Sequence, residues 1–184
     1  MRRSKEFDIP TAARECLGSY DEWPCLPTGI DPMPYLSRNR VLQPFHLASA
    51  HDRLLVHLAG RGRVEFREAS VHYFELACGD FVYLPAGTPS RIMPETPCLQ
   101  LIYRAEPWEQ ETVLWYCPGC GVELRRIALD GAEGLLQHAY WAACQTFNVD
   151  PVTRTCVRCA AIHPPVDLTD IRWPEVAAAI SHSG

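Results

Sequence analysis

Two pairs of cysteines in the last third of this 184-residue chain restrict its possible folds more than any other feature. Each pair has the spacing C-x-x-C: Cys117 with Cys120, and Cys156 with Cys159. A turn of this length brings two thiolates to one side of a metal ion, and two such turns complete a tetrahedral site. The four cysteines are therefore predicted to hold one ion, zinc or iron.

The residues around these pairs favour a metal site over a redox motif. Pro118 fixes the first turn, and Gly119 and Gly121 permit backbone conformations in which amides face the sulfurs. The 35 residues between the pairs lengthen the loop, but closure entropy grows only logarithmically and costs well under ~1 kcal/mol here. A redox motif would need one pair at a helix start. Four thiolates leave no open position, so a structural role is expected.

Composition excludes several classes of function. Nine cysteines, an odd number, fit a secreted disulfide framework poorly, and a reducing compartment such as the cytoplasm is the expected location. The formal net charge of −5 gives no global basic field, so nucleic acid is not an expected partner. No run approaches 18 apolar residues, and no apolar stretch follows the N-terminal arginines. Neither a membrane span nor a signal peptide is expected.

The chain divides into three predicted parts. The central part contains short runs with alternating apolar residues, such as VHYFEL, GDFVYLPAG and CLQLIYRA, separated by Gly, Pro and Ser. This pattern is typical of an all-β barrel or sandwich. Helical stretches are expected at 134–144 and 170–180. The predicted parts are an N-terminal arm (1–38), a barrel core (39–106) and a C-terminal segment with the four cysteines (107–184).

The stretch GDFVYLPAGTPS, from Gly79 to Ser90, resembles the second motif of the cupin superfamily. That motif is Gly, five residues, Pro-x-Gly, and a metal-binding His three residues later, where this chain has Ser90. The first cupin motif has a Glu seven residues before a turn glycine, and Arg53 stands seven before Gly60. The resemblance implies a mainly-β fold, a double-stranded β-helix or jelly-roll barrel, with a small rubredoxin-like extension.

The order of the parts resembles bacterial 3-hydroxyanthranilate 3,4-dioxygenase more narrowly. The resemblance rests on WYCPGCG from Trp115 to Gly121 and on CVRCAAIHP from Cys156 to Pro164. In that family a ferrous ion, held in the barrel by two His and one Glu, binds the aminophenol and oxygen for ring opening, while the four-cysteine site is remote. The resemblance implies a homodimer and a small aromatic or ring-opened carboxylate as substrate.

Carried over by position, the family's iron ligands are missing. Its Glu becomes Arg53, its second His becomes Ser90, and its first His falls on Leu47, with His46 beside it. No catalytic iron is therefore expected, because a guanidinium repels a divalent cation. Strand alternation places His57 on the same face as Arg53. Arg53 is then the candidate clamp for a substrate carboxylate, and His57 the candidate acid or base.

Other substrate-binding positions of the family fall near Arg91 and Tyr103. The candidate catalytic residues are therefore His57, Arg53 and Tyr103, and the candidate substrate-binding residues are Arg53, Arg91, Ser90 and His46. Two alternatives stay open. In the first, His57 is a satisfied core histidine and Arg53 is a rim or salt-bridged residue. In the second, a shifted metal site forms from His46, His51 or Asp52 with His57.

The leading hypothesis is a repurposed cupin enzyme that performs metal-independent cyclisation, isomerisation or hydrolysis on such a carboxylate. By resemblance, a tryptophan-derived or specialised biosynthetic pathway would be its setting. One alternative is a non-catalytic, ligand-binding pseudoenzyme. Another is a ring-cleaving dioxygenase with a rebuilt iron site.

Overall fold

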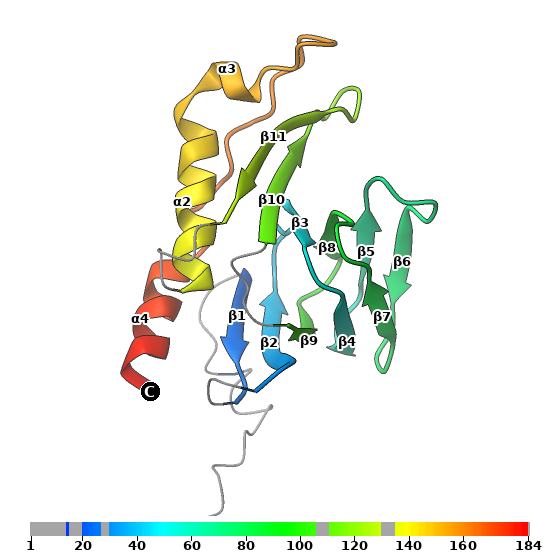
Figure 1. Cartoon of the computed structure of the whole chain (residues 1–184), viewed down its shortest axis with the longest axis vertical. Helices are drawn as coiled ribbons and strands as arrows, with labels where there is room; N and C mark the ends of the chain where they lie inside the picture. Colours follow the sequence, from blue (N-terminus) through cyan, green and yellow to red (C-terminus); the bar gives the residue numbers. More distant parts are fainter. Residues whose placement is uncertain (1–13, 15–19, 27–29, 106–110, 130–134, 184) are drawn as a thin grey trace, which may run out of the picture.

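The computed structural model describes residues 14, 20–26, 30–105, 111–129 and 135–183, and its described strands form two antiparallel sheets (Figure 1). The five-stranded sheet contains, in spatial order, β1 (Tyr20–Pro24), β2 (Met33–Asn39), β9 (Cys98–Arg104), β4 (Arg53–Ala59) and β7 (Phe81–Leu84). The six-stranded sheet contains β11 (Glu123–Ala128), β10 (Glu111–Tyr116), β3 (His46–Ser49), β8 (Ser90–Pro94), β5 (Gly62–Phe66) and β6 (Tyr73–Leu76).

The eight strands from β2 to β9 have jelly-roll connectivity. Their order is β2-β9-β4-β7 in one sheet and β3-β8-β5-β6 in the other, so the chain passes repeatedly between two facing sheets. This confirms the mainly-β, double-stranded β-helix class implied by the cupin resemblance. The two sheets also contain strands that lie before and after residues 39–106 in the chain, since β2 begins at Met33 and β10 ends at Tyr116. The division into three parts stays a prediction.

Side chains at alternate strand positions point inward and fill the space between the sheets. Along β4, the side chains of Arg53, Leu55 and His57 are buried, whereas Leu54 and Val56 are half-buried. Successive residues of a strand point to opposite faces, so the buried set faces the interior. The apolar interior consists of Leu55, Val64, Phe66, Leu76, Val82, Leu84, Ile92 and Ile102.

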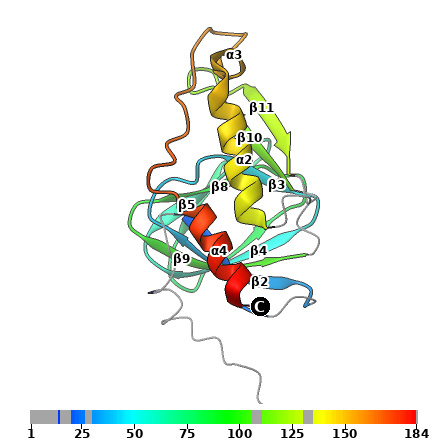
Figure 2. The same ribbon diagram turned by 90° about the vertical axis from the view of Figure 1, so that its left-hand side faces the viewer.

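The helices cover one side of this barrel. They are α2 (Leu136–Val149), α3 (Pro151–Arg154) and α4 (Trp173–Ser183), and α2 and α4 confirm the helices expected at 134–144 and 170–180. α2 and α4 lie against each other beside β1 (Figures 1 and 2). Trp115 of β10 stacks on Phe147 of α2 with ring centroids 4.3 Å apart. No helix of the described part is long and apolar enough to cross a membrane.

A buried ion network joins the helical layer to the barrel. Arg104 of β9, 1% exposed, donates to Glu22 Oε2 and to Glu111 Oε2, each at 2.7 Å. The hydroxyl of Tyr140 in α2 lies 3.5 Å from Arg104 Nη1, and Gln137 donates to the carbonyl oxygen of Glu22. Burial acts to lower the pKa of Arg104, but Glu111 and Glu22 raise it well above its usual value. The guanidinium therefore stays charged and links β1, β9 and β10.

Arg104→Met is expected to lower the free energy of unfolding by about 3–5 kcal/mol, because it leaves two buried carboxylates without their cation. Urea titration followed by circular dichroism, at constant metal content, measures this. The matched control is Arg126→Met, which removes an exposed pair with Glu123 (2.8 Å) and should cost less than about 1 kcal/mol. Equal small effects of the two substitutions would contradict the structural role of the buried network.

Candidate functional site

The four predicted cysteines converge on one point. Their sulfur atoms all lie within 4.8 Å of one another, with Cys117 Sγ 3.4 Å from Cys159 Sγ and Cys120 Sγ 3.6 Å from Cys156 Sγ. A tetrahedral ion with metal–sulfur bonds of about 2.3 Å separates its sulfurs by about 3.8 Å. The cluster therefore fits one metal ion. Among the described residues no other group of three or more His, Cys, Asp or Glu side chains converges in this way.

Backbone amides prepare the sulfurs for a metal. The Gly119 amide donates to Cys117 Sγ at 3.3 Å, and the Arg158 amide donates to Cys156 Sγ at 3.4 Å. Burial would raise the pKa of the Cys117 thiol, but amide hydrogen bonds and the neighbouring thiols lower it to about 6. Such amide-to-sulfur bonds orient metal ligands and stabilise their thiolate form. The two C-x-x-C turns thus have equivalent local structures.

Inside the barrel, Arg53, Ser90 and Leu47, which the resemblance aligned with iron ligands, come together. Arg53, 5% exposed, donates from Nη2 to the Leu47 carbonyl oxygen (3.1 Å) and to Ser90 Oγ (3.3 Å). Leu47 and Ser90 face each other across the β3–β8 pairing. The cavity left beside them measures about 10 Å³, enough for about one water molecule. This interior has no room for an aromatic acid.

The charge of Arg53 belongs to the buried network described above. No carboxylate of the described chain lies within 4 Å of its guanidinium, and its Nε has no hydrogen-bond partner. Burial raises the pKa of Glu111, while Arg104 and Arg53 act to lower it. Arg104 therefore makes the direct ion pairs with Glu22 and Glu111, and Arg53 acts on Glu111 from beyond ion-pair distance.

His57 and Tyr103 have no contact with Arg53 in the structure. His57 is fully buried, and its Nε2 lies 3.1 Å from the Gly60 carbonyl oxygen, which can only accept, so the proton is on Nε2. Its Nδ1 then accepts from Gln100 Nε2 at 3.5 Å. Both ring nitrogens are occupied, as in a core histidine. Tyr103 is half-buried and precedes the inward-facing Arg104, which places it on the outer face of β9.

His46 and Arg91, in contrast, line a second cavity on the outer face of the six-stranded sheet. It measures about 350 Å³, and its walls come from β3, β8, β10 and the first cysteine turn, with Arg67, which follows β5, and His163. His46 is 3% exposed, and its ring meets that of Tyr116 edge to face at 4.9 Å. Burial, together with Arg91 and Arg67, lowers the pKa of His46 to about 2, so its imidazole is neutral.

Sequence reasoning missed Glu65 and Arg67, which complete this site. Glu65 Oε2 accepts from Arg91 Nε (3.1 Å) and Nη2 (2.7 Å), and Glu65 Oε1 accepts from Arg67 Nη2 (3.0 Å). The Arg67 guanidinium also lies over the Tyr116 ring, 5.3 Å from its centroid. The alternation of charged Glu65 and Arg67 with apolar Val64 and Phe66 was the available signal that they share an outer face.

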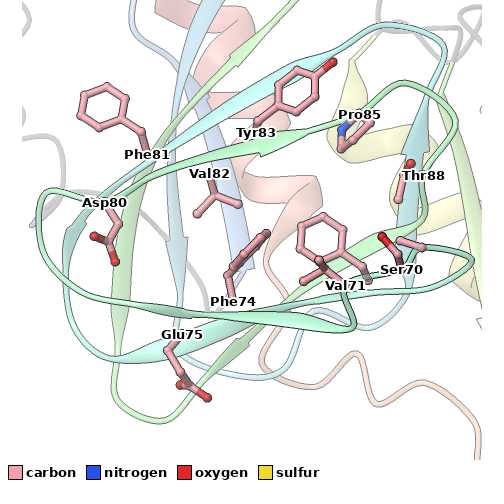
Figure 3. Close-up of a pocket in the computed structure, with 12 residues that line it drawn as sticks. Ser70, Val71, Phe74, Glu75, Asp80, Phe81, Val82, Tyr83, Pro85 and Thr88 are labelled. Carbon is pink, nitrogen blue, oxygen red and sulfur yellow. The ribbon is translucent and has the colours of Figure 1, made fainter.

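A larger cavity lies elsewhere, between the outer strands β6 and β7 of the two sheets. It measures about 620 Å³ and is mostly apolar, and none of the sequence-predicted site residues lines it. Figure 3 shows Phe74 and Val82 facing each other across it, with Phe81 and Tyr83 on the other side of β7. Phe81 is 69% exposed. No described residue covers this groove.

Comparison with known proteins assigns neither a family nor a function to this chain. No family model matches the chain, and no curated protein matches its sequence. Among solved structures it is similar to hydroquinone 1,2-dioxygenase PnpCD in complex with Cd²⁺ and 4-hydroxybenzonitrile (22% identity, 59% of this chain and 81% of that one, TM-score 0.47). Another similar structure is hydroquinone 1,2-dioxygenase from Sphingomonas sp. TTNP3 with 4-hydroxybenzoate bound (14% identity, 54% of this chain and 72% of that one, TM-score 0.48).

A third similar structure is an uncharacterized conserved protein with a double-stranded β-helix domain from Klebsiella pneumoniae (16% identity, 60% of this chain and 97% of that one, TM-score 0.49). These identities are too low to transfer a substrate or a reaction to this chain.

Gly121→Ala is expected to weaken metal retention about fivefold to thirtyfold, because Gly121 has φ 73° and a side chain in this conformation costs about 1–2 kcal/mol. Competition against a chelator at equilibrium measures the change. The matched control is the reverse substitution in the second turn, Ala160→Gly, where φ is 58°. It should retain the metal at least as well as the wild type, and equal weakening by both substitutions would contradict the argument.

Proposed function

We propose that this chain is a cupin of the 3-hydroxyanthranilate 3,4-dioxygenase type whose barrel has lost the ferrous site, and that it takes a small aromatic or ring-opened carboxylate as its ligand. The four cysteines would hold a structural zinc or iron, and a homodimer is proposed from the family resemblance. The observation that carries the proposal is the pair of hydrogen bonds from Arg53 Nη2 to Leu47 and Ser90.

The barrel residues do not fit a ferrous ion. The Leu47 side chain offers no ligand atom, Ser90 offers a hydroxyl that Arg53 already engages, and Arg53 itself is a cation. Unit charges 4 Å apart interact by about 4 kcal/mol at an effective dielectric constant near 20, and the cost is larger for a divalent ion. A guanidinium at this position therefore opposes the metal that the family places in the barrel.

The proposal has two forms, which differ in whether the ligand is converted. Metal-independent cyclisation, isomerisation or hydrolysis needs an acid–base group beside the ligand. His57 is sealed in the core with both nitrogens bonded, and the histidines that border an open cavity are His46 and His163. Binding without conversion needs no such group, and the sealed position of His57 favours this form. Turnover of a bound carboxylate would establish the enzymatic form.

Metal analysis tests the loss of the barrel iron. Protein produced with both iron and zinc available is expected to contain about one metal ion per chain by mass spectrometry of the elements. Cys117→Ser with Cys120→Ser should reduce this to about zero, whereas Arg53→Ala should leave it unchanged. A second metal ion per chain that survives the double cysteine substitution would overturn the proposal and support a rebuilt iron site.

A further inference from the structure

Two residues that line the outer cavity each carry a buried nitrogen atom without a hydrogen-bond partner. These atoms are Nε2 of His46 and Nε of Arg67, and both residues line the cavity of about 350 Å³. Both also lie close to Glu65: His46 Nε2 is 4.0 Å from Oε2, and Arg67 Nη2 is 3.0 Å from Oε1. Buried polar atoms normally have a partner, so two such atoms in residues that line one cavity indicate a site for a ligand.

The charge of the cavity wall favours an anion. Its lining includes Arg67 and Arg91 and no carboxylate residue, while Glu65 lies behind them and holds their guanidinium groups in place. Glu68, which accepts from the Tyr116 hydroxyl at 3.1 Å, also lies outside the lining. An arginine whose guanidinium is already held by a carboxylate of the protein, here Glu65, is preorganised for a planar anion, since its side chain loses less entropy on binding.

The remaining walls favour an aromatic ligand. Tyr116 contributes a ring that is held between the His46 edge and the Arg67 guanidinium. Trp115 and Pro118 add apolar surface, and Pro118 belongs to the first cysteine turn. A volume of about 350 Å³ is at the small end of the range for ligand pockets, which suits a single ring better than a nucleotide.

We infer that this outer cavity is the binding site for a small aromatic carboxylate, with the guanidinium groups of Arg67 and Arg91 and the His46 ring as its polar contacts. The inference deepens the proposed function by moving the carboxylate from the barrel interior to the junction of the six-stranded sheet and the four-cysteine turn. It rests on the proposed function for the choice of ligand class, whereas the site follows from the contacts above. Because Cys117, Pro118 and Gly121 form part of the wall, the metal centre shapes the pocket.

Calorimetric titration of the metal-loaded protein with benzoate tests the inference, with benzamide as the uncharged probe of the same shape. Benzamide should bind at least about tenfold more weakly than benzoate. Arg67→Met should weaken benzoate binding about tenfold or more, and His46→Phe, which keeps the ring, should weaken it severalfold. The matched control is Arg63→Met, since Arg63 lies in β5, just before Arg67 in the chain, over the Tyr73 ring (5.5 Å) and outside the cavity.

Several outcomes would overturn the inference. These are no benzoate binding at millimolar concentrations, equal binding of benzamide, or unchanged affinity in both Arg67→Met and His46→Phe. Binding that Arg53→Ala abolishes and Arg67→Met leaves unchanged would place the carboxylate in the barrel, which contradicts this site and leaves the proposed function standing. A second metal ion in the barrel would contradict the proposed function and leave the Arg67 result unaffected.

Discussion

The balance of four buried charges is the constraint on which the rest of the structure depends. Arg53 and Arg104 face Glu22 and Glu111 in the barrel interior, and Arg104 makes direct ion pairs with both carboxylates at 2.7 Å. Burial of any one of these groups without the others would be strongly unfavourable. The cluster fixes β1 and β10 against the jelly roll, and the Tyr140 hydroxyl of α2 contacts it. Arg53 lies at the position that the family resemblance aligns with a metal ligand.

The four-cysteine cluster and the barrel interior thus have different roles in this chain. The four-cysteine cluster has sulfurs close enough for one ion and amides directed at them, and it organises the turn after β10. The barrel interior is occupied by Arg53 and retains a cavity of only about 10 Å³. Between the two regions lies a cavity that combines arginines, a neutral buried histidine and aromatic walls. A ligand there would contact both the six-stranded sheet and the metal-bearing turn.

The sequence predicted the features that depend on local spacing. The C-x-x-C pairs predicted the four-cysteine cluster and strand alternation predicted the β-barrel class, and the structure shows both. The motifs singled out Arg53 and Ser90 separately, and the hydrogen bond between them (3.3 Å) is a finding of the structure. Contacts between segments that are distant along the chain could not be predicted from the sequence. Glu65 meets Arg91 because β5 pairs with β8 in that register, and Glu22 meets Arg104 across 82 positions. Only the folded pairing makes Arg67 part of a site.

Anomalous scattering from crystals grown with Fe²⁺ and Zn²⁺, recorded at the absorption edge of each metal, tests the central claim most directly. The account predicts one peak per chain, surrounded by the sulfurs of Cys117, Cys120, Cys156 and Cys159, and no peak within coordination distance of Ser90 Oγ. A second peak inside the barrel, with the Arg53 guanidinium displaced to admit it, would contradict the proposal that Arg53 stands in place of a barrel iron.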